Sequence, residues 1–493
     1  MISSRILRKF ILAECDKLIG RHHKYHNAVE MIHVREKKRL KSPPPKKIKI
    51  PDYWSSKLFN PFYVKKHIDA IVLSLSKKLQ NDTYLPHKPF CKNIAKKGGG
   101  ERKISVYEIP DAAVSNLVFR SLMNKNVHRF SSFSYAYRTD RNVHYAIQDI
   151  AISLKYRDRL FISEFDFSDF FGSISHDYLF AQISENGFIF TDQERNIIKA
   201  FLHDREVGIP QGTSLSLFLA NMVCWKLDRN FEDEGLKFAR YADDTVIWSG
   251  QYEKICKSYD IIKEFSKNAG VNINVKKSNG ISLLSAAGIP SEFGTVREYF
   301  DFLGYRVSVD KVSIKEDSVK KIKKNISYIL YKHLIQPIMG PKLLSIEVPT
   351  NNRDKDFVVA LQLIRRYLYG NLTEGLLEDY ISGRIIHLQF KGLMSFYPLV
   401  TDADQLKQLD GWLEHAVFCT LKKRARLFGQ HGLNMVANNF PFNVPQKDIL
   451  TEFDSVYVGK KKLYKIPSFM RIYEAMKKGV VSDGINFSDN YHY

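Results

Sequence analysis

Residues 238–249 read Phe-Ala-Arg-Tyr-Ala-Asp-Asp-Thr-Val-Ile-Trp-Ser, and this stretch decides how the chain folds. Two short runs rich in β-branched and aromatic residues, 236–239 and 245–248, predict two strands joined by a tight turn. The turn carries two adjacent carboxylates, Asp243 and Asp244, whose side chains point to opposite faces of an extended chain. Burying a carboxylate is costly unless it is paired or binds a metal ion. The turn is therefore either a solvated hairpin tip, where Asp is common, or part of a metal site.

A second acidic stretch favours the metal site. Residues 160–171 read Leu-Phe-Ile-Ser-Glu-Phe-Asp-Phe-Ser-Asp-Phe-Phe, an apolar strand that ends at Asp166. If this strand lies beside the other two, Asp166 and Asp243 can share a pair of divalent cations. Two such ions, about 3.5–4 Å apart, would contact the attacking and leaving oxygens of an in-line phosphoryl transfer. Mg²⁺ suits this role because it prefers hard oxygen ligands and keeps water and substrate phosphates in its coordination shell.

The charge balance points to a polyanionic partner. The chain has 493 residues, with 75 Lys and Arg against 53 Asp and Glu, which gives a formal net charge of +22. Basic residues that neutralise phosphates release condensed counterions, so nucleic acid is the favoured partner. No stretch resembles a basic amphipathic membrane anchor. A hydrophobic content of 44% and an aromatic content of 13% fit a globular protein of several domains.

Other features exclude several classes of protein. The apolar runs are far shorter than the roughly 18 residues of a membrane span, and the start of the chain lacks the apolar core of a secretory signal. The cysteines are odd in number and never form a C-x-x-C pair, so neither a zinc site nor a disulfide framework is expected. A cytoplasmic location is the expectation. These cysteines are Cys15, Cys91, Cys224, Cys256 and Cys419.

The acidic motifs resemble the palm of a reverse transcriptase. Tyr241-Ala242-Asp243-Asp244, preceded by the Asp166 strand, has the form of the catalytic segments of that family. Four further motifs follow the family's order over roughly residues 85–310. They are Ser-Tyr-Ala-Tyr-Arg at 134–138, Ile-Pro-Gln-Gly-Thr-Ser-Leu-Ser at 209–216, Gly-Val-Asn-Ile-Asn-Val-Lys-Lys-Ser at 270–278 and Phe-Leu-Gly-Tyr at 302–305.

The resemblance implies an α+β protein with the right-hand polymerase fold, which has fingers, a palm with an antiparallel sheet and a helical thumb. The shift to basic, helical sequence after about residue 310 fits a thumb. The expected parts are a basic N-terminal extension at 1–50, fingers at 51–155, a palm with part of the fingers helices at 156–310, a helical thumb at 311–435 and a C-terminal tail module at 436–493.

The resemblance also implies the catalytic residues. Asp166, Asp243 and Asp244 would be catalytic and would bind two Mg²⁺ ions per active site, together with the backbone carbonyl of Phe167. A Gly-rich hairpin at 96–104 would cover the incoming triphosphate. An arginine suits this hairpin because a guanidinium can bind phosphate oxygens with two hydrogen bonds. Arg102 matches the family's triphosphate-binding arginine and Lys97 its lysine, although a solvated basic turn is the alternative.

The nucleotide pocket is completed by residues from three motifs. Phe171, five residues after Asp166, stands where the family has its steric gate, a ring that would clash with a 2′-hydroxyl and so selects deoxynucleotides. Gln211 and Gly212 would line the pocket, since glycine allows close backbone approach. Lys277 would lie near the leaving pyrophosphate. Core packing of Phe171 and a surface position of Lys277 remain the alternatives.

Further contacts with nucleic acid are expected outside the pocket. Arg138 would touch template or nucleotide, or else form a buried pair with an acid. The basic strip at 35–47 and the aromatic, basic tail at 457–464 would bind a nucleic-acid backbone, or would be a solvated linker and a small packed module. The primer grip, which positions the primer terminus, would be Phe302, Leu303, Gly304 and Tyr305, with a core-only role as the alternative.

The subgroup is suggested by what the chain carries and lacks. Many relatives have proline where Leu217 stands, and no acidic or Cys/His cluster after residue 310 resembles an RNase H or HNH nuclease. These features most resemble the defence-associated bacterial reverse transcriptases. The resemblance implies an RNA-directed DNA polymerase using dNTPs, an RNA template or non-coding RNA and a DNA product, with homo-oligomers possible and no membrane partner. The alternatives are a retron or group II intron enzyme, a non-templated polymerase, and an RNA-binding scaffold with a relict palm.

Overall fold

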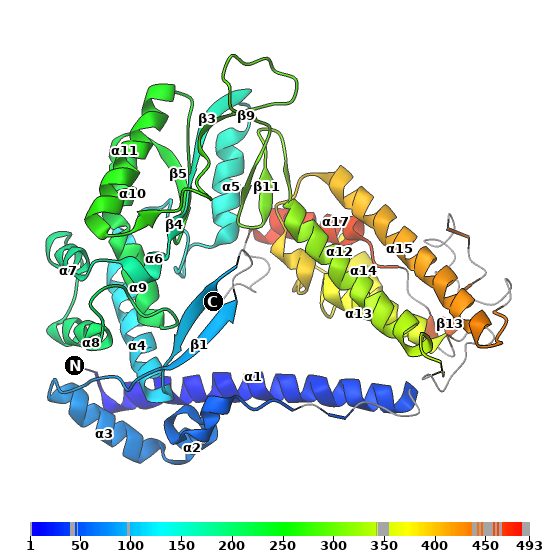
Figure 1. Ribbon diagram of the computed structural model, residues 1–493, viewed down its shortest axis with the longest axis horizontal. Helices are drawn as coiled ribbons and strands as arrows, with labels where there is room; N and C mark the ends of the chain where they lie inside the picture. Colours follow the sequence, from blue (N-terminus) through cyan, green and yellow to red (C-terminus); the bar gives the residue numbers. More distant parts are fainter. Residues whose placement is uncertain are drawn as a thin grey trace. The chain divides into compact units, whose positions relative to one another are not determined.

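The computed structural model contains helices and strands throughout (Figure 1) and divides into two compact units. The first unit comprises residues 1–30, 47–146 and 158–297, and the second comprises 31–46, 147–157 and 298–493. The finer domain boundaries expected from the sequence stay a prediction. The structure describes residues 2–39, 45–46, 48–95, 99–341, 343, 354–435, 441–442, 445–446, 457–458, 461–462 and 466–485.

The first unit is organised around a five-stranded sheet with the strand order β5-β6-β3-β8-β9. Both strands predicted on either side of Asp243 form, and the predicted acidic strand lies beside them. All strand pairs in this sheet are antiparallel except β8 with β9, which are parallel. The segment 286–295 connects these two parallel strands. The strands are β3 (Arg159–Phe165), β5 (Lys237–Tyr241), β6 (Asp244–Ser249), β8 (Gly280–Ser285) and β9 (Val296–Arg297).

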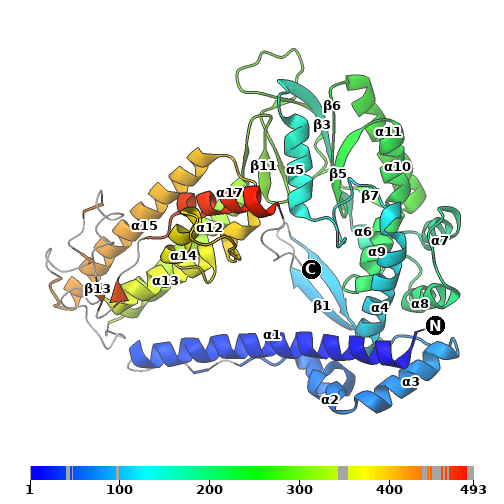
Figure 2. The same ribbon diagram turned by 180° about the vertical axis from the view of Figure 1, so that it is seen from behind.

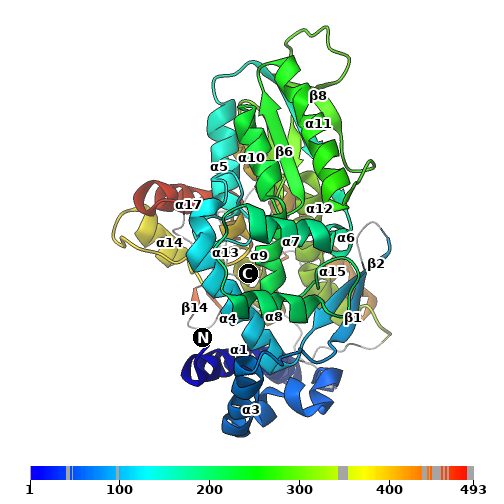
Figure 3. The ribbon, with the colours of Figure 1, turned by 90° about the vertical axis from the view of Figure 1, so that its left-hand side faces the viewer.

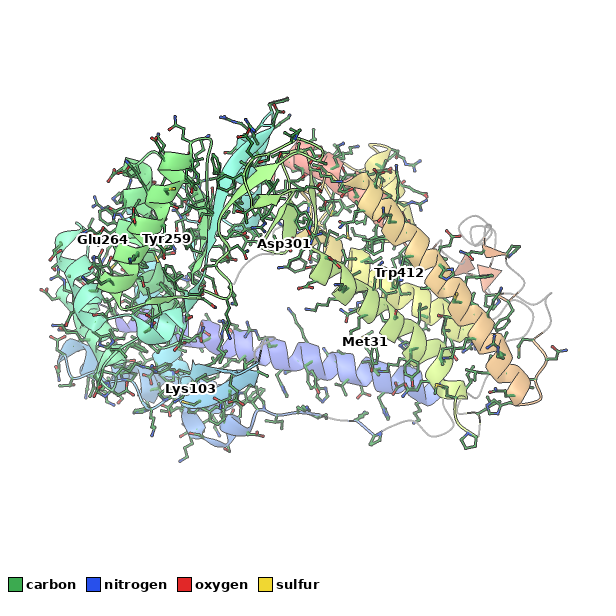
Figure 4. All side chains as sticks on the ribbon, turned by 45° about the horizontal axis from the view of Figure 1, so that its top comes forward. Met31, Lys103, Tyr259, Glu264, Asp301 and Trp412 are labelled. Atoms are coloured by element: carbon green, nitrogen blue, oxygen red, sulfur yellow. The ribbon has the colours of Figure 1, made fainter. Side chains whose placement is uncertain are left out.

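Two helices pack on this sheet, α10 (Trp225–Asp233) and α11 (Tyr252–Ala269), and Figure 3 shows them alongside β6. The buried residues of α11 include Ile255, Ile262 and Phe265, whose spacing places them on one helical face. Tyr259 and Glu264, labelled in Figure 4, lie on the same helix. The helix ends at Gly270, whose φ of +74° allows the left-handed cap.

A helical layer forms the rest of the core of the first unit. Helix α9 (Ser214–Val223) packs on α4 (Ile109–Asn126), and Thr213 caps α9 by accepting a hydrogen bond from the amide of Ser216. Leu217 therefore lies inside the helix. The other helices are α6 (Phe170–Ser173), α7 (His176–Glu185) and α8 (Asp192–Leu202), with a 3₁₀ turn η3 (Val127–Arg129).

The N-terminal part of the first unit is mostly helical. Helix α1 (Ser4–Arg39) begins in this unit and buries Leu7, Ile11 and Cys15, which form one helical stripe. The helical stretch that starts at Pro61 is interrupted at His67, whose backbone leaves the helical conformation. The elements are η1 (Asp52–Ser55), η2 (Lys57–Phe59), α2 (Pro61–Lys66) and α3 (Ile68–Gln80).

The Gly-rich hairpin predicted from the sequence is confirmed. Strands β1 (Phe90–Ala95) and β2 (Glu101–Val106) pair in antiparallel register, and Lys103 on β2 is labelled in Figure 4. Gly99 and Gly100 both have positive φ angles near the tip. Lys97 lies outside the described residues.

The second unit combines a small sheet with helices (Figure 2). Its sheet has the order β10-β11-β12, and Lys323 of α12 stacks 5.4 Å from the ring of Trp412 on α15, which Figure 4 labels. The elements are β10 (Phe300–Phe302), β11 (Tyr305–Val307), β12 (Val312–Ile314), α12 (Glu316–Leu330), the π-helical η4 (Tyr331–Ile335), η5 (Gln336–Ile338), α13 (Lys355–Tyr369), α14 (Glu374–Ile381), η6 (Leu393–Phe396), α15 (Ala403–Gln430), β13 (Tyr457–Val458), β14 (Lys461–Lys462) and α17 (Phe469–Asp483). Helix α5 (Val143–Leu154) crosses the division between the units.

Helix α15 buries Leu406, Leu409 and Leu413 along one face. Arg424 of the same helix is also buried, with its Nε and Nη2 each 3.2 Å from Asp354. Within the aromatic, basic tail predicted at 457–464, the structure describes residues 457–458 and 461–462. Among the described helices, none combines the length and apolar character that a membrane crossing requires.

Candidate active site

The sheet register brings the acidic strand and the acidic turn together. Strand β3 is the central strand, and its last residue, Phe165, pairs with Thr245 of β6. Asp166 directly follows Phe165 and Asp244 directly precedes Thr245, so two segments far apart in the sequence place carboxylates at one end of the sheet. The convergence predicted from the sequence is thus present in the structure.

The turn between β5 and β6 is tight and strained. Tyr241 pairs with Asp244, which leaves Ala242 and Asp243 as the two turn residues. Ala242 has a φ of +62°, a left-handed conformation that hairpin turns usually assign to glycine. Such strain persists only when the surrounding structure enforces it, and it concentrates at functional sites.

Asp166 is held by the segment that follows α11. Its backbone amide donates to Oγ of Ser278 at 3.2 Å, and its carbonyl accepts from the amide of Asn274 at 2.8 Å. The Asn274 side chain also donates to Oδ2 of Asp166 at 2.9 Å, and Nζ of Lys277 lies 3.0 Å from the same oxygen. Sequence reasoning singles out Lys277 but misses Asn274 and Ser278, although both belong to the 270–278 motif.

The three carboxylates influence each other electrostatically. Burial raises the pKa of Asp243, and the negative charge of Asp166 raises it further, while Arg102 and Lys277 lower it. The side chain of Asp244 keeps some contact with solvent. Desolvation by the surrounding atoms, together with the negative charges of Asp243, Asp166 and Glu164, raises its pKa to about 7. Neighbouring carboxylates repel one another when all of them are ionised, and a shared cation offsets this repulsion. This donor set therefore fits a divalent metal ion bound through oxygen.

A cavity of about 1050 Å³ opens beside the carboxylates. Asp166, Phe167 and Asp243 line it, whereas Asp244 is not among the lining residues, which agrees with the alternation of side chains at the turn. The cavity is bordered by polar and charged side chains from the hairpin and the sheet. Cations that line it are Arg102, Lys103, Arg205 and Lys277.

Four of the nucleotide-site residues predicted from the sequence line this cavity, namely Arg102, Phe171, Gln211 and Lys277. Arg102 lies on β2, within electrostatic reach of Asp243, and Gln211 and Phe171 also line the wall. The Phe171 ring lies edge-on to the ring of Tyr137, with 6.5 Å between centroids. Sequence reasoning does not single out Arg205 or Tyr137 as pocket residues.

Gly212 lies against strand β2. A Cβ added at this residue would lie 2.5 Å from the carbonyl oxygen of Ser105 on β2, and its φ is +117°. The amide of Ser105 also donates to the carbonyl of Gln211 at 2.8 Å. The glycine therefore allows close approach of strand β2, and its role beside a nucleotide stays a prediction.

Arg138 is committed to protein partners. Its side chain is 5% exposed and forms two hydrogen bonds with Asp140, at 2.9 and 2.6 Å, and a third with the carbonyl of Ser131 at 2.6 Å. Of the two alternatives that the sequence leaves open, the structure has the pairing with an acid. A contact with nucleic acid stays untested.

The primer-grip residues belong to the second unit. Phe302 and Tyr305 are buried, and Leu303 and Gly304 form a turn in which both have positive φ. The hydroxyl of Tyr305 donates to the carbonyl of Phe396 at 2.8 Å. Core packing accounts for Phe302 and Tyr305. The role of all four residues in binding a primer stays a prediction.

A sheet that presents carboxylates to a cation-lined cavity, with a basic hairpin on its wall, defines the palm of a right-hand nucleotidyltransferase. Residues 94–307, less than half of the chain, match the sequence model of the family described as "Reverse transcriptase (RNA-dependent DNA polymerase)". This region is therefore a reverse transcriptase domain, whose enzyme class is that of RNA-directed DNA polymerases. The predicted α+β right-hand fold is confirmed.

Individual relatives are distant. The retron Ec86 reverse transcriptase of Escherichia coli is 25% identical over 246 residues, which cover 48% of this chain and 68% of that protein. A putative COX1/OXI3 intron 2 protein of Saccharomyces cerevisiae is 22% identical over 428 residues, which cover 69% of this chain but only 46% of that protein. A solved telomerase from Candida albicans, in complex with a TWJ fragment of telomeric RNA, is 13% identical with a TM-score of 0.36, covering 75% of this chain and 66% of that one.

Proposed function

We propose that the whole chain is an RNA-directed DNA polymerase that uses two Mg²⁺ ions. The observation that carries this proposal is the convergence of Asp166 and Asp243 on one cavity, inside the region that matches the reverse transcriptase family. The similarity to the retron Ec86 reverse transcriptase of Escherichia coli supports a polymerase of bacterial type.

In the proposed reaction, the primer 3′-hydroxyl releases its proton to water and its oxygen bonds to the α-phosphorus of a dNTP, while the bond from that phosphorus to the α,β-bridging oxygen breaks and pyrophosphate leaves. Two Mg²⁺ ions, when bound, would lower the charge that develops on the attacking and leaving oxygens. Asp166 and Asp243 would hold these ions, with Asp244 and the Phe167 carbonyl contributing. Asp166, Phe167 and Asp243 line the cavity, and the charges of Asp166 and Asp243 also act on Asp244.

The cationic wall would bind the triphosphate. Arg102 offers a planar fork of N–H donors that matches phosphate oxygens, and Lys277 would stabilise the charge of the departing pyrophosphate. Phe171 would pack under the sugar and exclude a 2′-hydroxyl, which favours dNTPs over ribonucleotides.

The direct test is incorporation of labelled dNTPs on an RNA template with a DNA primer. Asp243→Asn is expected to abolish synthesis, and Asp244→Asn, whose side chain does not line the cavity, to reduce it less. Asp260→Asn, an exposed acid on α11, is the matched control and should be neutral. Synthesis that survives Asp243→Asn would reject the proposal, while RNA binding without any synthesis in the unaltered protein would favour the scaffold alternative.

For the biological role we propose antiphage defence together with a non-coding RNA, in the cytoplasm of a bacterium. The motif around Leu217 supports this subgroup, while the match to a retron enzyme supports the retron alternative and the match to an intron protein the group II alternative. Sequencing the nucleic acid that co-purifies tests these alternatives, since an intron RNA would favour the group II enzyme. Loss of phage resistance on Asp243→Asn is the expected outcome, and unchanged resistance would contradict the role.

A further inference from the structure

Arg240 is a buried arginine beside the catalytic turn. It is fully shielded from solvent, yet it does not line the cavity and belongs to none of the motifs assigned to catalysis. Its Nε and Nη2 donate to the two carboxylate oxygens of Asp228, each at 2.6 Å. A buried ion pair with two such bonds is rigid, so it fixes where the rest of the guanidinium points.

The remaining donors of the guanidinium reach the catalytic turn. Nη1 donates to the carbonyl oxygen of Ala242 at 3.0 Å and to Oδ1 of Asn221 at 3.3 Å. Ala242 is the turn residue with positive φ, and Asp243 is its neighbour in the sequence. An alanine lacks the freedom of glycine in this conformation, so a bond to its carbonyl helps to hold the strained turn in place.

The same side chain also holds the segment that carries Tyr137. Nη2 of Arg240 donates to Oγ of Ser134 at 2.8 Å, and the Arg240 backbone exchanges hydrogen bonds with Phe133 and Tyr135. Tyr137 follows in this segment and lines the cavity. It has a φ of +60°, and its ring lies edge-on to the ring of Phe171.

We propose that Arg240 is a positioning residue that couples the metal-binding turn to the wall of the sugar pocket. One guanidinium bridges the carbonyl of Ala242 and the Ser134 segment, so the spacing between Asp243 and the Tyr137–Phe171 pair depends on it. A lysine could neutralise Asp228 but lacks the planar fork that reaches both groups at once. This inference rests on the proposed function, which supplies the metal and the nucleotide.

The test compares Arg240→Lys with Arg424→Lys. Arg424 is an equally buried arginine that pairs with Asp354 in the second unit, so its replacement controls for the loss of a buried fork. The first readout is Mn²⁺ binding followed by electron paramagnetic resonance, with Asp243→Asn identifying the site. The second is the ratio of kcat/KM for a ribonucleotide to that for the matching deoxynucleotide.

Arg240→Lys is expected to weaken Mn²⁺ binding about tenfold and to change the ribonucleotide ratio by a similar factor, because small misplacements of site groups have large effects. Arg424→Lys should change neither value, at a comparable loss of melting temperature. Adding Ala242→Gly to Arg240→Lys should restore much of the Mn²⁺ affinity, because glycine adopts the turn without strain. Unchanged Mn²⁺ affinity in Arg240→Lys, or no restoration by glycine, would overturn the proposal.

Two further outcomes are decided in advance. If Arg240→Lys does not fold, Ser134→Ala removes only one partner of the guanidinium and should shift the ribonucleotide ratio in the same direction; an unchanged ratio would overturn the inference. If the unaltered protein binds Mn²⁺ at Asp243 but incorporates no nucleotide, the proposed function fails, while the Mn²⁺ comparison still decides the role of Arg240.

Discussion

The Nζ of Lys277 lies 3.0 Å from Oδ2 of Asp166. The ammonium group therefore occupies part of the space beside Asp166 that a bound metal ion would need. The Lys277 side chain is 68% exposed, which allows it to move away when a metal ion or a phosphate enters. Under the proposed function, Lys277 would therefore compete with the metal ion in the free protein and would contact the phosphates in the working complex.

This competition predicts opposite effects of one substitution. Lys277→Gln is expected to raise the affinity for Mn²⁺ by a factor of about 2–5, a modest gain because solvent screens the exposed ammonium, and to slow dNTP incorporation. Titration of Mn²⁺ and single-turnover kinetics measure the two effects. Lys276→Gln, the exposed neighbour, is the matched control. Weaker Mn²⁺ binding in Lys277→Gln would contradict the competition.

Phe171 predicts the sugar preference. Phe171→Ala removes a ring from the cavity wall and is expected to raise ribonucleotide incorporation at least about tenfold relative to deoxynucleotide, since the 2′-hydroxyl no longer meets a steric barrier. Competition between the two nucleotides in one reaction gives the ratio. Phe293→Ala removes a ring that does not line the cavity and should leave the ratio unchanged. A ratio unaltered in Phe171→Ala would assign that ring to the core.

Gly212 predicts a stability effect that depends on close approach. Gly212→Ala places a Cβ 2.5 Å from the Ser105 carbonyl and adds strain at a φ of +117°, so it should lower the melting temperature and separate β2 from the cavity wall. Gly288→Ala has the same type of strain, at a φ of +80°, but no atom within 4 Å. It should cost only about 1 kcal/mol. Equal losses in the two variants would show that the Ser105 contact is unimportant.

Asp111 predicts how stability changes with pH. Burial raises its pKa from 3.8 to about 6, although the Tyr84 hydroxyl and the His87 amide donate to it. The folded state therefore favours the protonated acid, and the stability that this proton provides is complete below about pH 4 and lost as the pH rises through 6. Relative to Asp111→Asn, the unaltered protein should lose up to about 3 kcal/mol of unfolding free energy between pH 4 and 7. Denaturant unfolding at several pH values measures this difference, and a difference that stays constant would contradict it.

Much of the palm could be predicted because its signals are local. Short runs rich in β-branched and aromatic residues and an Asp-Asp turn mark β5 and β6, and the strand ending at Asp166 needs only one pairing assumption to complete the site. The Gly-rich hairpin likewise carries its own turn signal.

The remainder depends on contacts between distant residues. Arg240 meets Ser134, 106 residues away in the sequence, and Asn274 meets Asp166 across 108 residues. Neither residue differs in type from many surface side chains, so only the folded structure reveals that one is buried and that the other supports a carboxylate. The pairing of Arg138 with Asp140 was open for the same reason, because an arginine near an acid serves packing and ligand binding equally well.

The polarity of the central strand has a practical use. Strand β3 runs from Arg159, which pairs with Ser285, to Phe165 at the acidic end, a span of about 20 Å. The segment 286–295 leaves the sheet at the end opposite the carboxylates, where it appears as the loop at the top of Figure 1. A fluorophore or affinity tag attached in this loop would give a handle for immobilisation and single-molecule observation that leaves the entrance of the cavity unobstructed.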